Sequence, residues 1–184
     1  MRSKTIRKSP EGKYPFYVGN SASPNAKAQA TIAIEASKMM YNLLQLRKSL
    51  PVKSSAIQKS FRYLIDMIEW HFYCSDGKYC RISKEAQKLE DSQGGKLFYG
   101  QCIFEHTVPM KTICDILLEQ STSPEDCLSL LRKWLLVTII TKEEDTKLNQ
   151  GYRTSMPDDW DGIDPWARYR KVGIEVDDET FLNN

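Results

Sequence analysis

The sequence predicts a mainly α-helical α+β domain, and three observations support this. The first half of the chain carries apolar residues at helical spacing, two short runs of β-forming residues follow, and the chain after residue 150 has little periodicity. The 184 residues, 41% of them hydrophobic, are enough for one domain with a substantial core. We expect an N-terminal helical hairpin, a small two-stranded β element with inserted helices, and an irregular C-terminal wrap.

The chain divides into an arm and a single globular domain. Residues 1–27 contain three prolines and several Gly, Ser and Asn residues, a composition typical of an extended segment. We therefore expect a basic arm over residues 1–27 and one globular domain over residues 28–184.

Residues 28–82 are predicted to form the helical hairpin. Pro51 ends the first helix, Ser54 and Ser55 are candidate caps for the second, and the short connection favours antiparallel packing. Each helix has an apolar face: Ile32, Ala36, Met39, Leu43, Leu46 and Leu50 in the first, and Ile57, Phe61, Leu64, Ile65, Ile68 and Phe72 in the second.

The middle of the chain alternates helical and strand-like segments. A short helix capped by Ser83 precedes a strand over residues 97–104, and residues 134–140 (WLLVTII) form a second strand. Between the strands we expect one helix that starts near Pro109 and another that is capped by Ser123. After the second strand, Thr141 and Glu144 match a capping box at the start of a further helix.

Composition indicates a soluble protein of the cytoplasm with no membrane partner. The mean hydropathy is −0.50, and no apolar run approaches the roughly 18 to 20 residues of a spanning helix. The N-terminal MRSKTIRKSP lacks the apolar centre of a signal peptide. Five cysteines are an odd number in a chain that needs no disulfide framework, which favours a reducing compartment.

The small net charge of +2 conceals a strong asymmetry along the chain. Residues 1–100 hold 17 Lys and Arg against 8 Asp and Glu, whereas residues 101–184 hold 9 against 16. A basic half can steer a protein to a polyanion, most commonly nucleic acid, or it can face the acidic half of the same chain or of a second copy.

The basic residues near the hairpin turn are the best candidates for nucleic-acid contact. Side chains there can neutralise phosphates without reading bases, so binding would be salt-sensitive and tolerant of sequence. The arm adds further basic residues, for which a solvated arm is the alternative. The candidates at the turn are Arg47, Lys48, Lys53, Lys59 and Arg62.

The strand that runs into Glu105-His106, with Pro109 three residues later, is the motif most informative about chemistry. Together with the later strand and the capped helix that carries Asp145, residues 97–150 resemble the HNH or ββα-metal nucleases. The resemblance implies a strand hairpin packed on a helix, with Glu105 and Asp145 as ligands of Mg²⁺ or Mn²⁺ and His106 as the general base. It thereby implies a divalent-metal nuclease that acts on DNA or RNA phosphodiesters.

Two features depart from that family pattern. Two predicted helices lie between the strands, and the asparagine that usually orients the histidine has no counterpart before Ile140, because Asn149 comes too late.

Other sites and functions remain open alternatives. Trp160, Trp166 and Tyr169 can stack on bases or anchor the tail. The chain lacks Walker-type, Gly-x-Gly-x-x-Gly and Gly-x-Ser-x-Gly motifs. The alternative function is a non-catalytic interaction protein, such as a defence-system or phage-type accessory factor, that binds a protein or nucleic acid through its basic N-terminal half. A structural Zn²⁺ site, which competes with the nuclease for His106, has the candidate ligands His71, Cys74, Cys80, Cys102 and His106.

Overall fold

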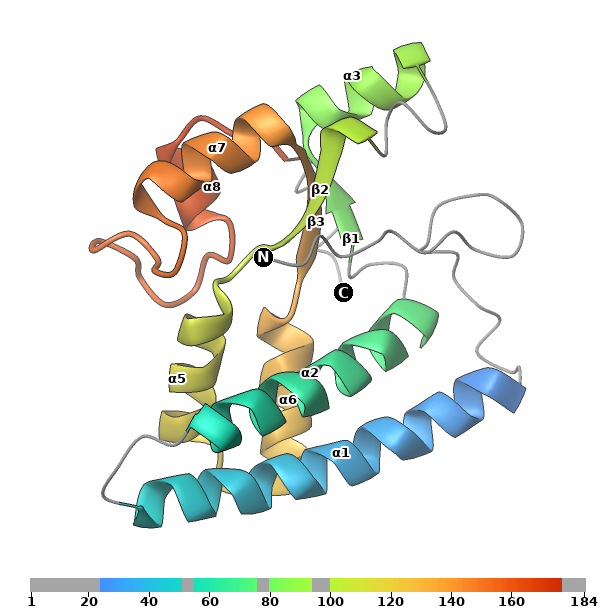
Figure 1. Ribbon diagram of the computed structural model, residues 1–184, viewed down its shortest axis with the longest axis vertical. Helices are drawn as coiled ribbons and strands as arrows, with labels where there is room; N and C mark the ends of the chain where they lie inside the picture. The colour runs from blue at the N-terminus through green and yellow to red at the C-terminus, as the bar shows by residue number, and fades with distance from the viewer. Residues whose placement is uncertain (1–23, 51–54, 76–79, 94–99, 177–184) are drawn as a thin grey trace.

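A computed structural model describes residues 24–50, 55–75, 80–93 and 100–176. It confirms the mainly helical α+β class (Figure 1). No helix within those ranges is both long and apolar enough to cross a bilayer. The elements are α1 (Pro24–Ser49), α2 (Ser55–Ser75), β1 (Cys80–Ile82), α3 (Lys84–Gln93), β2 (Cys102–His106), α5 (Met110–Gln120), α6 (Pro124–Trp134), β3 (Val137–Thr141), α7 (Lys142–Gly151) and α8 (Ala167–Lys171).

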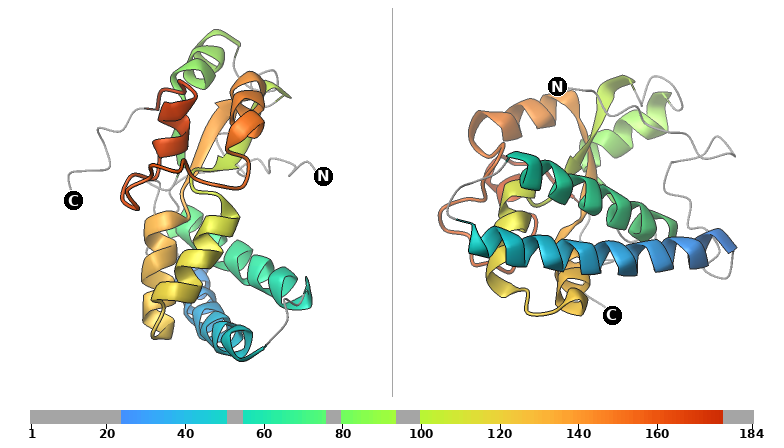
Figure 2. Two further views of the ribbon diagram at one scale, coloured as in Figure 1. Left: turned by 90° about the vertical axis from the view of Figure 1, so that its left-hand side faces the viewer. Right: turned by 60° about the horizontal axis from the view of Figure 1, so that its bottom comes forward.

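A helical layer forms one end of the molecule. Helices α1 and α2 pack as the predicted antiparallel hairpin, and the pair α5 and α6, inserted between β2 and β3, packs against them (Figures 1 and 2). Apolar residues of all these helices share one core with residues of β3, α7 and the C-terminal segment. Burial of this common core holds the helical layer and the sheet region together.

The sheet lies at the other end, with strand order β1–β3–β2. Strand β3 is central, antiparallel to β2 and parallel to β1, and all five of its residues are buried. The prediction of a two-stranded element therefore missed β1. With only three residues, β1 is too short to show the alternation that identifies a strand.

The two faces of the sheet have different neighbours. Cys102 and Ile139 pack with Ala86 of α3, whereas Ile103 and Ile140 belong to the main core. Successive side chains of a strand point to opposite faces of the sheet. The faces of Cys102 and Ile103 therefore determine which side each later residue of β2 faces.

The apolar face predicted for the first helix is not the one that packs most deeply. Ala33, Met40 and Leu44 are buried with Ala36, whereas Ile32, Met39, Leu46 and Leu50 remain largely exposed. The helix carries two overlapping apolar stripes, and the one containing the small residues Ala33 and Ala36 faces the core because it allows neighbouring helices to approach closely.

Several element boundaries differ from the predicted ones. Helix α1 begins at Pro24, inside the predicted arm, where proline suits the first helical turn. Strand β2 begins at Cys102 rather than residue 97, and residues 97–99 lie outside the described ranges. Strand β3 begins at Val137 because α6 continues through Trp134. The predicted caps at Ser123, at Ser83 and at Thr141 with Glu144 are all confirmed.

Glu144 joins the starts of α3 and α7. Its Oε2 accepts hydrogen bonds from the backbone N–H of Thr141 (2.8 Å) and from the Ser83 hydroxyl (2.6 Å). The Ser83 oxygen in turn accepts the N–H of Ala86 at the first turn of α3 (3.1 Å). One buried carboxylate therefore completes both caps and fixes α7 relative to β1 and α3.

We expect Glu144→Ala to lower the free energy of unfolding by about 2–4 kcal/mol, because the Ser83 hydroxyl and the Thr141 N–H would lose their buried acceptor. Urea denaturation monitored by circular dichroism measures the change. Its matched control is Glu143→Ala on the exposed side of the same turn. Equal losses for the two variants would contradict the role assigned to Glu144.

Candidate functional site

Glu105 and His106 end β2, and their side chains take opposite sides of the sheet. Glu105 pairs with Thr138 and His106 with Val137 in the antiparallel register. Adjacent residues of a strand face opposite ways. The contacts agree, since Glu105 bonds to a residue of α8 and His106 to a residue of α2.

On one side of β2, the Arg168 side chain bonds to Glu105, His106 and Thr107 at the end of the strand. It also bonds to Tyr152 at the end of α7. The Arg168 side chain is fully buried, and Nη2 donates to Glu105 Oε1 (2.8 Å) and to the carbonyl oxygen of His106. Nε donates to the carbonyl oxygen of Thr107 (2.8 Å), and Nη1 donates to that of Tyr152 (2.8 Å). A buried guanidinium needs such partners, and this set satisfies it.

The C-terminal wrap delivers Arg168 to this position. Trp166 and Tyr169 are buried in the main core, and Trp134 meets Trp160 edge to face with ring centroids 5.6 Å apart. These aromatic residues therefore anchor the tail instead of offering open faces to bases. Sequence reasoning missed Arg168 as a site residue, although its position between two large aromatic residues was a sign of burial.

Asp145 lies in the first turns of α7 and is electrostatically coupled to Glu105. Partial burial, followed by the negative charge of Glu105, raises the pKa of Asp145 above its ordinary value. The Asn149 amide donates to Asp145 Oδ2 (2.9 Å), and the charges of Arg168 and Arg153 oppose the shift. The charges of Glu105 and Asp145, the two metal ligands that the family resemblance implies, therefore interact in the structure.

This pair of carboxylates fits a hard divalent cation in the type of its donors. Mg²⁺ commonly takes one or two protein carboxylates and completes its shell with water and substrate phosphate oxygens. Among the described residues, no His, Cys, Asp or Glu joins Glu105 and Asp145 to make a candidate group of three or more ligands. Arg168 already offsets part of the negative charge at Glu105.

On the other side of β2, His106 bonds to Glu69 of α2. The His106 Nε2 to Glu69 Oε1 distance is 2.8 Å, and the side chains are 15% and 8% exposed. An ionised carboxylate only accepts hydrogen bonds, so a bond from His106 to ionised Glu69 requires a proton on Nε2. Glu69 was missed from the sequence, although an acidic residue four positions after the buried Ile65 was the available signal.

The cysteines of the chain have different surroundings. Cys102 is buried against Ala86 and Ile139, and this burial, with nearby carboxylates, raises the pKa of its thiol to about 11. Cys114 and Cys127 pack on or within the main core, as small apolar residues do. The side chains of His71, Cys74 and Cys80 lie outside the described part of the structure.

The predicted basic residues gather at one end of the helical hairpin. Arg47 and Lys48 lie in the last turn of α1, and Lys59 and Arg62 lie in the first two turns of α2. None of these side chains forms an ion pair with another described residue. Lys53 lies outside the described ranges.

Comparisons with family models, with curated proteins and with solved structures found no match for this chain.

We expect Arg168→Ala to cost about 3–5 kcal/mol of stability, because it leaves the Glu105 carboxylate and backbone carbonyls without their donor. The matched control is Arg170→Ala, which removes an exposed ion pair with Asp164 and should cost less than about 1 kcal/mol. Denaturant unfolding of both variants measures the difference. Similar small losses would show that the Arg168 bonds do not hold the tail.

We expect Asp145→Asn to stabilise the protein near neutral pH and to lose that advantage in acid. The pKa of Asp145 is raised in the folded state, so ionisation there is less favourable than in the unfolded chain. The folded state therefore binds protons more readily, and the unfavourable contribution of this group develops as pH rises through the folded pKa. Melting temperatures of wild type, Asp145→Asn and Glu143→Gln across acidic to neutral pH test this. An advantage that grows toward low pH would contradict it.

Proposed function

We propose that this protein hydrolyses nucleic-acid phosphodiester bonds, with His106 as the general base. The observation that carries the proposal is the Glu69–His106 hydrogen bond at the end of β2. A histidine base needs a fixed tautomer and ring orientation, and a carboxylate bound to one ring nitrogen supplies both. Glu69 thus provides the orienting group for which the sequence showed no asparagine.

The topology around His106 supports the same assignment. Strands β2 and β3 pair antiparallel, and α7 follows β3 directly and packs against both strands. This is the order of elements that the family resemblance implies, with α5 and α6 inserted between the strands. Likeness of topology supports a reaction class only together with a suitable site.

In the proposed reaction, water loses its proton to Nδ1 of His106 as its oxygen attacks the phosphorus atom. The bond from phosphorus to one ester oxygen breaks, and the departing oxygen takes a proton from solvent water. Glu69 holds the ring and stabilises the imidazolium that forms. The partly exposed His106 side chain keeps the ring in contact with solvent. Because His106 and Glu105 face opposite sides of β2, the phosphate has to lie at the end of this strand, where both sides can be reached.

Glu105 and Asp145 are the residues that would hold a divalent cation. Bound there, Mg²⁺ or Mn²⁺ would neutralise charge on the phosphate. Asn149 orients Asp145 through its amide, and Arg168 orients Glu105. Phosphates farther along the substrate would meet the cationic side chains at the hairpin end, among them Arg47, Lys48, Lys59 and Arg62.

A second candidate function is non-catalytic binding of nucleic acid or a protein through the basic hairpin end. The cationic side chains at the hairpin end favour this function, because they would be present even if His106 had only a structural role. It predicts polyanion binding that falls with salt and does not depend on Glu69 or His106.

Cleavage assays discriminate between the two functions. Purified protein is incubated with labelled DNA and RNA in Mg²⁺, in Mn²⁺ and in EDTA, beside His106→Ala, Glu69→Gln and Asp145→Asn. We expect His106→Ala to lose at least about 100-fold in rate, the contribution typical of a general base. Glu69→Gln should lose less and shift the pH profile, and Asp145→Asn should weaken the dependence on metal concentration.

The control is Glu143→Gln, an exposed acid on the same helix as Asp145. Cleavage that is equal in wild type and His106→Ala, or no cleavage by either of two folded proteins, overturns the proposed hydrolysis. Metal dependence that is unchanged in Asp145→Asn removes only the cation site.

A further inference from the structure

We infer that the nucleic acid this protein binds is single-stranded, and that it lies along the outward face of α2. The inference deepens the proposed function and rests on it for the position of the reacting phosphate. It commits the protein to one substrate class, which neither the basic composition nor the family resemblance specifies.

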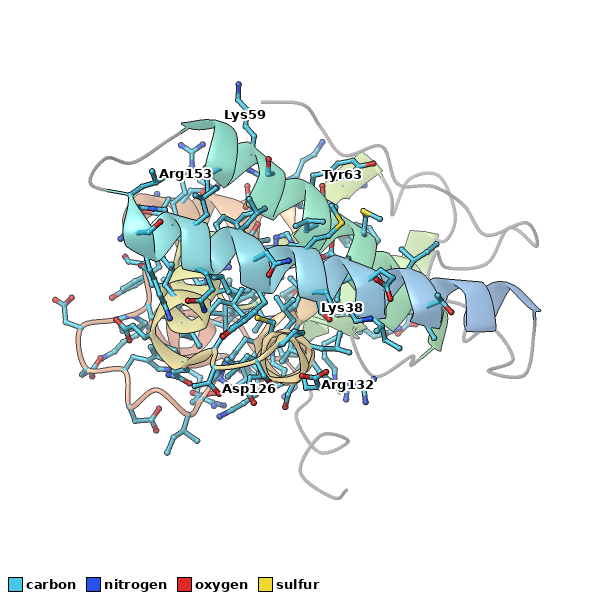
Figure 3. All side chains as sticks on the ribbon, turned by 90° about the horizontal axis from the view of Figure 1, so that it is seen from below. Lys38, Lys59, Tyr63, Asp126, Arg132 and Arg153 are labelled. Atoms are coloured by element: carbon cyan, nitrogen blue, oxygen red, sulfur yellow. The ribbon has the colours of Figure 1, made fainter. Side chains whose placement is uncertain are left out.

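The outward face of α2 combines cations with an exposed aromatic ring. Lys59 and Tyr63 are four residues apart, and Arg62 lies between them on the exposed side. Tyr63 is 68% exposed, and Figure 3 shows Lys59 pointing away from the body of the molecule. Residues three or four apart on a helix are neighbours, so these side chains form one continuous surface.

The cationic side chains and the tyrosine ring can bind different parts of a flexible nucleic-acid strand. Lys59 and Arg62 form no ion pair within the described part of the chain, so both can neutralise phosphates without breaking an ion pair there. Asp66 also lies on this face and opposes the cations. An exposed tyrosine offers a stacking platform to an unpaired base, whereas bases inside a duplex have their faces covered by their neighbours.

The position of this face relative to His106 makes it a path to the reacting group. Glu69, which holds His106, lies on the same helix seven residues after Arg62, or about 10 Å along its axis at 1.5 Å per residue. A strand held at Arg62 and Tyr63 therefore reaches the end of β2 within the roughly 4 to 16 nucleotides of a typical single-strand site.

Equilibrium binding separates this inference from catalysis. The probe is a fluorescent 20-nucleotide single strand, as DNA and as RNA, compared with the matching duplex. Anisotropy is measured with His106→Ala protein in EDTA, so that cleavage does not interfere. We expect the single strand to bind at least tenfold more tightly than the duplex.

Substitutions on α2 then separate stacking from charge. Tyr63→Ala should weaken single-strand binding at least roughly fivefold without changing its salt dependence, and Tyr63→Phe should restore it. Lys59→Ala with Arg62→Ala should reduce the slope of log affinity against log salt by about 1.4, that is, about 0.7 for each phosphate that the protein no longer neutralises.

The controls carry equivalent changes elsewhere. Ile163→Ala removes a side chain that is 70% exposed, and Arg132→Ala with Lys133→Ala removes one arginine and one lysine from α6. Figure 3 shows Arg132 on the opposite side of α1 from Lys59. Equal affinity for duplex and single strand, or equal effects of the Tyr63→Ala and Ile163→Ala variants, overturns the inference. Loss of cleavage in His106→Ala with binding intact leaves it standing.

Discussion

The geometry of the candidate site depends on the burial of one positive charge. Removing a guanidinium from water costs several kcal/mol unless its donors find acceptors, and Arg168 finds them in Glu105 and in the carbonyl oxygens of His106, Thr107 and Tyr152. Those acceptors belong to the end of β2 and the end of α7. The same bonds that satisfy Arg168 therefore fix the backbone of the two segments that present His106 and Asp145.

A second constraint comes from the alternation of side chains along β2. Glu105 faces Arg168 and the charge of Asp145, while His106 faces Glu69 on the helical layer. The imidazole of His106 and the carboxylate of Glu105 are thereby kept on opposite sides of one strand, each with its own partner.

Local patterns in the sequence predicted most of the elements, because their signals lie within a few residues. Ser123, Thr141 with Glu144, and Pro109 mark helix starts where the structure has them. The buried face of α1 was harder to predict, since two apolar stripes overlap and only the packing of neighbouring helices selects between them. Strand β1 is defined by its pairing with β3, and no local pattern encodes a partner more than 50 residues away.

The contacts around the candidate site could not be predicted from the sequence, for the same reason. Glu105, His106 and Asp145 were named through the family resemblance, and their chemical roles stay predictions. Glu69 and Arg168 approach β2 from 37 and 63 residues away in sequence, so that only the fold reveals them.

The order of the strands also affects biosynthesis. Strands β1 and β2 leave the ribosome before β3, which lies between them, so each waits with unpaired edges until the central strand emerges. The three-stranded sheet therefore forms only after β3 has left the ribosome, late in the synthesis of the described residues.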